Sequence, residues 1–330
     1  MSVDDCQIAS KFQCAMCGGT KHTLYVKMDV YSIVRCLTCN ALLTSPIPSA
    51  RNQQEHYEKN YYSNKDGNRF RFGIATVVQG AFRKIRARTM RRHLPYISGR
   101  KVLDIGCGRG EVLQQFKKWG ADVYGIELSG AAADVAAMKI GNTRIIRSEL
   151  NNMHFSSQYF DLITMWHVLE HVRHPVNILQ NVARLLKPDG IGYIEVPNAA
   201  GRVATTWKES WLGYDLPNHL THFSIETLKD AADRGGLECI EWKFWSAEYD
   251  PMTLLQTILN EWLGGENILF SLLTHEQKTG TKKSERISVI KRSIHLTAAI
   301  FLLVPVFVAS WILARKKVGD TIGVYVRPAL

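Results

Sequence analysis

About a third of the way along the chain, a short apolar segment, a cluster of glycines and an amphipathic stretch follow one another without a break. Residues 101–105 read KVLDI, residues 106–110 read GCGRG, and residues 111–120 read EVLQQFKKWG. The first segment is typical of a buried strand, and the third places apolar residues at helical intervals. Glycines allow the backbone between them to turn close to a ligand. Because a second apolar segment, ADVYGIEL, follows, the run predicts a strand–helix–strand unit of a nucleotide-binding sheet.

Three acidic residues around this turn narrow the choice of ligand. Asp104 precedes the first glycine, Glu111 begins the helix, and Glu127 ends the second strand. Glu127 follows the turn by about 20 residues, where a carboxylate binds ribose hydroxyls. A dinucleotide places its pyrophosphate against the helix N-terminus, where Asp104 and Glu111 would repel it. The glycine spacing also differs from G-x-G-x-x-G, so the pattern favours S-adenosylmethionine over NAD.

The run LDIGCGRG resembles the signature loop of the class I S-adenosylmethionine-dependent methyltransferases, and the resemblance continues over residues 100–250. YFDLITMW is similar to the fourth strand of that family, HVLEHV to the beginning of the next helix, and IGYIEVPN to the fifth strand. The resemblance implies an α/β fold with a Rossmann-like, seven-stranded sheet whose last strand is antiparallel. It implies a cofactor site made of Asp104, Gly106, Cys107, Gly108, Glu127, Leu128, Glu149, Leu150, Trp166 and His167.

Four cysteines in two Cys-x-x-Cys pairs predict a metal site near the N-terminus. Cys14 and Cys17 form one pair and Cys36 and Cys39 the other, with about 18 residues between the pairs, as in many zinc sites. Four thiolates close a tetrahedron around Zn²⁺ and leave no open position, so we expect a structural ion. The paired spacing favours a reducing compartment over a disulfide framework. A zinc ribbon before such a domain resembles proteins of glycan, polysaccharide or quinone methylation.

The charge balance favours an acidic partner. The formal net charge is +11 at pH 7 and the pI is about 9.3, which suits nucleic acid, an anionic lipid surface or a phosphorylated substrate, unless the excess only keeps the protein soluble. Many basic residues fall in the helical pattern of residues 76–97, which offers either an anion-facing surface or a solvated face. We expect a zinc ribbon over 1–48, a linker and basic helix over 49–98, a methyltransferase core over 99–249 and 319–330, and an apolar helical insertion over 250–318.

Two histidines are candidates for the catalytic base. Methyl transfer to a hydroxyl group requires removal of its proton, and histidine suits this task near neutral pH. His167 and His219 fall in segments expected at the carboxyl edge of the sheet, where open α/β sheets bind ligands. We expect one of these two to be the base. For His171 we expect a buried side chain that is hydrogen-bonded to a loop.

The C-terminal part raises the question of a membrane span. An apolar run of about 20 residues, bordered by Lys291, Arg292 and residues 315–317, is long enough to cross a bilayer. The β-branched pattern of DTIGVYVRP after it predicts the last strand of the sheet. A single crossing would separate this strand from its neighbours by the bilayer, so we exclude it. The insertion is then either a helical cap over the acceptor or an apolar patch on an anionic membrane surface.

These features predict an S-adenosylmethionine-dependent enzyme that methylates an oxygen, less readily a carbon or nitrogen, of a small or lipid-linked acceptor. That acceptor would be a glycan-precursor sugar or a quinone ring. An RNA methyltransferase is the first alternative, but MWHVLEH lacks the Asn/Asp-Pro-Pro-aromatic motif of base amino-group methylation, which makes nucleic acid a poor candidate. A non-catalytic S-adenosylmethionine-binding protein is the second. The N-terminus shows no signal-peptide pattern, so we expect a cytoplasmic protein or one peripheral to the inner face of the membrane.

Overall fold

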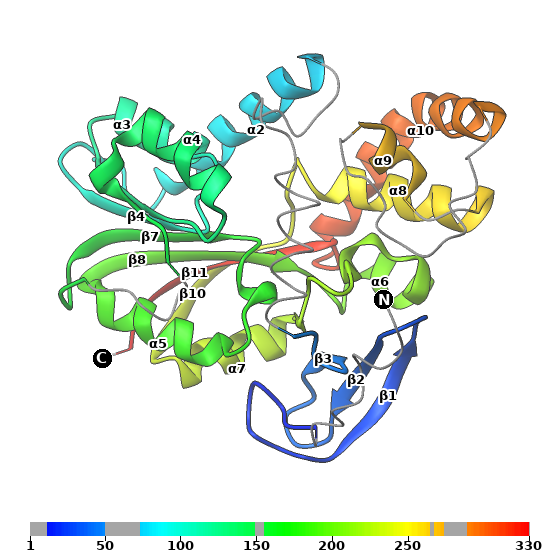
Figure 1. The fold of residues 1–330 in the computed structure, drawn as a ribbon, viewed down its shortest axis with the longest axis horizontal. Coiled ribbons are helices and arrows are strands. Elements are labelled where there is room, and N and C mark those ends of the chain that lie inside the picture. The colour runs from blue at the N-terminus through cyan, green and yellow to red at the C-terminus, as the bar shows by residue number, and fades with distance from the viewer. Residues whose placement is uncertain (1–11, 50–72, 149–154, 265–266, 274–288, 330) are drawn as a thin grey trace.

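Two β-sheets organise the chain, one of seven strands and one of four (Figure 1). The structure is a computed structural model that describes residues 12–49, 73–148, 155–264, 267–273 and 289–329. Most of the expected linker lies outside these residues. The strands of the larger sheet are β4 (Lys101–Ile105), β5 (Asp122–Ile126), β6 (Ile145–Ile146), β7 (Phe160–Trp166), β8 (Leu186–Pro197), β10 (Leu237–Lys243) and β11 (Thr321–Pro328).

The larger sheet confirms the predicted fold class. Its strand order is β10–β11–β8–β7–β4–β5–β6. Strands β4 to β8 are paired in parallel, whereas β11 is antiparallel to both of its neighbours, β8 and β10. The last strand is therefore inserted between two earlier ones. This is the Rossmann-like methyltransferase sheet that the family resemblance implied.

Helices cover both faces of the larger sheet and bury it (Figure 1). On one face lie α2 (Gly73–Met90), α3 (Glu111–Lys118) and α4 (Gly130–Ile140). The other face carries α5 (Pro175–Leu185) and α7 (Ile225–Arg234). Strand β7 has seven buried residues in a row, as a central strand covered on both sides should have.

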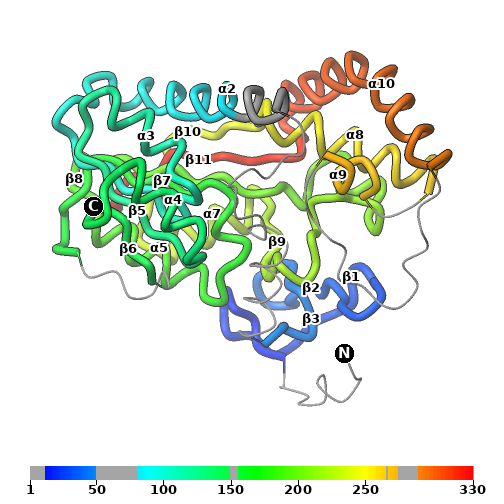
Figure 2. The backbone as a smooth tube through the Cα atoms, turned by 45° about the horizontal axis from the view of Figure 1, so that its top comes forward, coloured from blue at the N-terminus to red at the C-terminus, as the bar shows by residue number. Residues whose placement is uncertain are grey.

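The smaller sheet joins the N-terminal segment that carries the four cysteines, here called the ribbon (residues 12–49), to the segment with the larger sheet. It consists of β1 (His22–Lys27), β2 (Ser32–Cys36), β3 (Leu42–Ser45) and β9 (Thr221–His222), in that order. The first two strands lie between the two cysteine pairs, and the third follows the second pair. The fourth comes from the loop that follows the candidate base His219 and pairs with β3, and Figure 2 shows it beside the ribbon strands. The ribbon sheet is thus completed by a segment of the core.

The segment after β7 differs from its expected form. HVLEHV was expected to begin a helix, but only one 3-10 turn forms, η3 (Leu169–His171), and α5 begins at Pro175. Proline disfavours helical geometry in the residue before it, and His174 has φ −130° and ψ 74°. The interruption places the side chains of the 3-10 turn at the edge of the sheet and not along a helix.

The insertion before β11 is helical, as predicted. It contains α8 (Asp250–Leu263), α9 (Ile268–Leu273) and α10 (Val289–Arg315), and α10 packs on the other two. Between β8 and β9 lie α6 (Arg202–Trp207) and the short turns η4 (Lys208–Ser210) and η5 (Leu212–Tyr214), which contact α8. By length and composition, α10 could cross a bilayer. However, α10 leads directly into β11, which pairs with β8 and β10. A single crossing by α10 would separate β11 from these strands, as expected from the sequence.

Candidate active site

The glycine-rich turn after β4 takes a shape that requires glycine. Gly106, Gly108 and Gly110 all have positive φ, at 70°, 53° and 72°, a region that side chains with a Cβ rarely adopt. A Cβ on Gly106 would lie 2.4 Å from the Val168 side chain. The turn therefore closes tightly over the end of β7. The backbone of this turn can therefore line a ligand site beside the ends of β4 and β7.

Glu127 fixes the turn from the next strand. Its carboxylate accepts hydrogen bonds from the backbone N–H groups of Gly108 (2.8 Å) and Ser129 (2.9 Å). Burial raises the pKa of Glu127, while these backbone hydrogen bonds oppose the rise. A carboxylate offers about four acceptor positions, so two remain for hydroxyl groups such as those of a ribose.

Asp104 is a buried carboxyl group at the end of β4. It is 2% exposed and accepts a hydrogen bond of 2.6 Å from the Thr164 hydroxyl. Burial raises its pKa to about 7, although the Thr164 hydrogen bond and the positive charge of Arg86 act in the opposite direction. Its ionisation therefore falls in the neutral range, and a positively charged ligand beside it would favour the ionised form.

Arg86 on α2 is a site residue that the sequence did not single out. It is 7% exposed, pairs with Glu248 at 2.8 Å, and stacks over the rings of Trp166 and Tyr249 at 5.1 and 5.0 Å. The sequence pattern predicted a surface position for the basic residues of this helix, whereas the Arg86 side chain is buried. One signal was available: Ala87 and Met90 beside it belong to an apolar stripe that faces the core.

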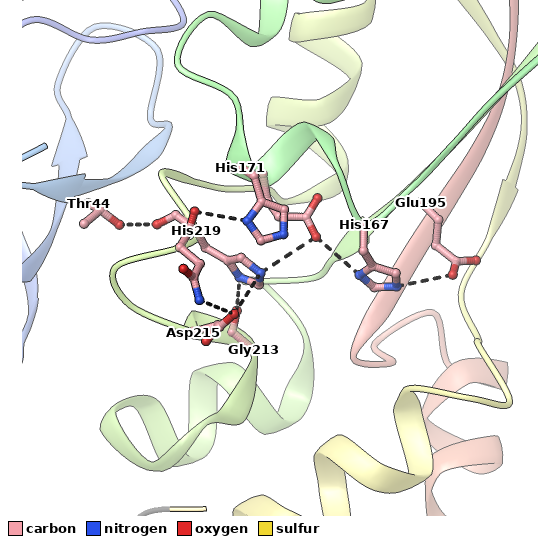
Figure 3. A network of polar contacts seen from close by, with 9 residues as sticks. Thr44, His167, His171, Glu195, Gly213, Asp215 and His219 are labelled. Atoms are coloured by element: carbon pink, nitrogen blue, oxygen red, sulfur yellow. Dashed lines mark hydrogen bonds and ion pairs between the residues drawn. The ribbon is translucent and has the colours of Figure 1, made fainter. Parts of the chain in front are cut away.

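His167 is held between two buried carboxylates (Figure 3). Its Nδ1 lies 3.3 Å from Glu170 and its Nε2 lies 3.3 Å from Glu195. Its ring packs against Tyr249 at 3.8 Å. Burial would lower the pKa of His167, but Tyr249 and the two carboxylates outweigh it and raise the pKa to about 10. Both ring nitrogens therefore carry protons at neutral pH, and the side chain is a fixed cation.

His219 presents one basic nitrogen toward Glu170. Its Nδ1 lies 2.8 Å from the Gly213 carbonyl oxygen; since a carbonyl only accepts, Nδ1 carries a proton, and in the neutral ring the lone pair is on Nε2. Nε2 lies 3.9 Å from Glu170 and 3.8 Å from Asp215. His219 is 7% exposed. This nitrogen can accept a proton, whereas the ring nitrogens of His167 cannot.

Glu170, His171 and His219 also form a group that could hold a metal ion. One ligand atom of each lies within 4.8 Å of the others. His171 is bound to a loop as expected, with Nδ1 3.1 Å from the Asn218 carbonyl oxygen, but it is only partly buried. Burial lowers the pKa of His171 to about 4, and a positive charge on His219 would act in the same direction. A neutral imidazole at this position is a good metal ligand.

The N-terminal ribbon contacts the loop that carries His219. The Thr44 hydroxyl donates a hydrogen bond of 2.6 Å to the His219 carbonyl oxygen (Figure 3) and lies 3.0 Å from His222 Nε2. Its single proton is used in the first contact, so it accepts the second from His222. Thr44 is 1% exposed. A residue of the ribbon therefore fixes the backbone of the candidate base.

The four cysteines fit a zinc ion. The Sγ atoms of Cys14 and Cys39 lie 3.6 Å apart, as do those of Cys17 and Cys36, and all four lie within 4.8 Å of one another. Zn–S bonds of about 2.3 Å in a tetrahedron put sulfurs about 3.8 Å apart. Gly19 and Thr38 donate backbone N–H groups to Cys17 and Cys36. The residues present therefore suit a closed, structural site.

The remaining predicted cofactor residues have different surroundings. Cys107 is buried in the core beneath the turn, so its side chain packs there and does not line the turn's outer side. Leu128 is 48% exposed beside Glu127. Trp166 ends β7 and packs on Tyr193. Glu149 and Leu150 lie outside the described residues.

Comparisons with known proteins match the same part of the chain. A family described as "Methyltransferase domain" matches residues 79–241. The ubiquinone biosynthesis O-methyltransferase of Haemophilus ducreyi is 30% identical over 171 residues, which cover 47% of this chain and 71% of that protein. The protein of the same name from Actinobacillus pleuropneumoniae is 38% identical over 109 residues, covering 30% of this chain and 47% of the relative.

Solved structures resemble the fold more distantly. An S-adenosylmethionine-dependent methyltransferase from Archaeoglobus fulgidus is 21% identical with a TM-score of 0.45, and the match covers 74% of this chain and 93% of that one. The turn after β4, the sheet with its antiparallel last strand and the sequence matches agree with one another. The chain belongs to the family of S-adenosylmethionine-dependent methyltransferases.

Proposed function

We propose that this enzyme methylates a phenol-type oxygen on a quinone-like ring, with His219 as the general base. The observation that carries the proposal is the geometry of His219: its tautomer is set by the Gly213 carbonyl, and its basic Nε2 faces Glu170. The names of the curated relatives support the choice of acceptor, because those proteins are O-methyltransferases of ubiquinone biosynthesis. A lipid-linked form of such a ring is the acceptor that we favour.

We assign the cofactor to the turn after β4. Glu127 would accept the ribose hydroxyls, the backbone of Gly106, Cys107 and Gly108 would line the site, and Leu128 would pack beside it. Asp104 would face the positively charged end of the ligand, and the Arg86 guanidinium, buried near it, suits an amino-acid carboxylate. When bound, S-adenosylmethionine supplies a methyl carbon that an oxygen attacks in line with the departing sulfur.

His167 and His219 then have different roles. His219 Nε2 removes the proton of the acceptor hydroxyl as the new oxygen–carbon bond forms. His167, fixed as a cation by Glu170 and Glu195, cannot remove a proton. It keeps the Glu170 carboxylate in place, and that carboxylate stabilises the positive charge that His219 acquires. Of the two histidines that the sequence offered, we therefore propose His219 as the base.

We propose that the four cysteines hold a structural zinc ion and that the enzyme works in the cytoplasm, peripheral to the inner face of the membrane. The sulfur spacing supports the first point, and the exposed apolar surface of α10 supports the second. An RNA acceptor finds no support at the end of β7, where the chain reads Met165, Trp166 and His167.

The proposal is tested by supplying S-adenosylmethionine and a catechol with a short isoprenoid tail, with product detected by mass spectrometry. We expect a singly O-methylated product. His219→Gln should lower kcat by about 100-fold or more, the range for loss of a general base, whereas the exposed His174→Gln should leave it unchanged. Methylation of RNA but not of the catechol, or full activity of His219→Gln, would overturn the proposal.

A further inference from the structure

Helix α10 packs on the described part of the protein mainly through one stripe of its surface, although Phe307 outside this stripe also contacts Trp245. Its buried residues are His295, Ala299, Val306, Ser310 and Ala314. At 100° per residue these fall within about a third of the helix circumference. The stripe runs from the first turns to the last, so α10 lies along the protein over nearly its whole length.

The opposite face of α10 is apolar and exposed. No Asp, Glu, Lys or Arg occurs between residues 293 and 314, and only 11% of the most apolar window of the helix is buried. Twelve large apolar side chains on this helix are 40–77% exposed: Val289, Ile290, Ile294, Leu296, Ile300, Phe301, Leu303, Val304, Phe307, Val308, Trp311 and Ile312. Scattered exposed side chains are ordinary, but a contiguous apolar face of this size marks an interaction site.

Positive charges border this face at both ends. Arg292 is exposed near the beginning of α10, and Arg315, Lys316 and Lys317 are exposed at its end. Both views also place the basic helix α2 on the same side of the molecule as α10 (Figures 1 and 2). An apolar helix face flanked by cations complements the acyl boundary and the headgroups of an anionic lipid leaflet.

The connection to β11 sets the orientation of α10. Arg202 N–H donates to the Val318 carbonyl, and the Asn198 side chain donates to the Gly319 carbonyl, both immediately after the helix. Strand β11 then pairs with β8 and β10 from Thr321 onward. The end of α10 is thereby attached to the catalytic sheet. A helix fixed in this way along one side and at its end can lie on a leaflet, but it cannot cross one alone.

We propose that α10 lies in the plane of an anionic lipid bilayer, with its exposed face inserted in one leaflet and the bordering cations at the headgroups. The occupant of this face is the lipid surface itself. The inference rests on the peripheral membrane location proposed above and assigns the attachment to α10, and it depends on none of the catalytic residues. The insertion directly follows Tyr249, whose ring packs against His167, so it connects the candidate active site with the helix that would lie on the membrane. A lipid-linked acceptor would then meet the site without leaving the leaflet.

The test is co-sedimentation of the full chain with vesicles of phosphatidylcholine and phosphatidylglycerol, and with vesicles of phosphatidylcholine alone. We expect strong binding to the anionic vesicles. The double variant Phe301→Glu/Val304→Glu should bind at least about tenfold more weakly, because it places two charges in the apolar boundary. Lys316→Glu/Lys317→Glu should lose most of the preference for anionic lipid. Met138→Glu, at an equally exposed apolar residue on α4, is the matched control and should bind like the wild type.

Two further readouts decide between membrane and other occupants. Trp311 fluorescence should shift to the blue on vesicle binding, and Trp311→Phe should lack that shift. A C-terminal tag should stay accessible to protease outside the vesicles. A protected tag would show a span, and dimers without vesicle binding would show that a second copy covers the face; either result would overturn the proposal. Phe301→Glu/Val304→Glu should still methylate a water-soluble catechol. A failure of the membrane proposal would therefore appear in vesicle binding, whereas a failure of the proposed function would appear in catechol methylation.

Discussion

Replacing Thr44 by valine should impair methyl transfer, although Thr44 belongs to the zinc ribbon. Its hydroxyl donates to the His219 carbonyl at 2.6 Å and accepts from His222 at 3.0 Å. Valine keeps the shape of the side chain and removes both contacts. The buried His219 carbonyl and the His222 ring N–H would then lack these partners. His222 as a whole is only 4% exposed. The loop that holds the candidate base would lose its attachment to β3.

The size of the effect follows from these two contacts. A buried polar group left without a partner costs about 1–3 kcal/mol, so the free energy of unfolding should fall by about 2–6 kcal/mol at most. A displacement of about 1 Å of a catalytic group costs up to about 100-fold in rate. We therefore expect kcat of Thr44→Val to fall by about 10- to 100-fold. The affinity for S-adenosylmethionine should stay within about twofold, because the cofactor turn does not contact Thr44.

The assay measures kcat against pH, cofactor affinity and denaturant unfolding for three variants. Thr44→Ser keeps the hydroxyl and should recover most of the wild-type kcat. Thr23→Val, at an exposed residue of strand β1, is the control for introducing a valine into the ribbon. If Thr44→Val loses stability but keeps the wild-type kcat and pH profile, the ribbon does not position His219. Equal loss in the serine and valine variants would show that the hydroxyl is not responsible.

Three other perturbations test neighbouring parts of the account. Because burial raises the pKa of Asp104 to about 7, affinity for S-adenosylmethionine should rise by about tenfold from pH 6 to pH 8 in calorimetry, and Asp104→Asn should abolish the rise. His167→Gln leaves Glu170 and Glu195 without their cation, so unfolding by denaturant should show a loss of about 3–5 kcal/mol. The pKa of His167 is raised from 6.5 to about 10. The difference in free energy of unfolding between the wild type and His167→Gln should therefore be complete below pH 6.5 and shrink toward pH 10. A difference that grows with pH would contradict the ion-pair assignment. Cys36→Ser should lower zinc content, measured by mass spectrometry, and reduce kcat while cofactor affinity is kept; unchanged kcat in zinc-free protein would separate the ribbon from catalysis.

The fold was predictable where the sequence encodes local geometry. The glycines after residue 105 determine a turn by their positive φ, and the alternating pattern of DTIGVYVRP identified β11 despite the apolar helix before it. Gly18 and Asn40, after the cysteine pairs, also have positive φ, as turns of this kind require. These signals depend on neighbours in sequence, so a single chain suffices to find them.

Much of the site was not predictable, because it depends on contacts between distant segments. Thr44 reaches the catalytic loop only through the pairing of β3 with β9. Arg86 occurs in a run of basic residues, and its position beside the apolar Ala87 and Met90 was the one weak sign that it turns inward. Glu195 had a weak signal, as an acidic residue in the otherwise apolar strand IGYIEVP. Its partner His167 was found, but its role as a cation became clear only from the two carboxylates beside it.

The central claim is that Glu127 and the turn after β4 bind the adenosyl cofactor. Isothermal titration of the full chain with S-adenosylhomocysteine tests this claim most directly. The account predicts one site per chain and an affinity at least about tenfold weaker in Glu127→Ala, which removes the ribose-binding carboxylate. No heat of binding with the wild type, or equal affinity in the variant, would contradict it.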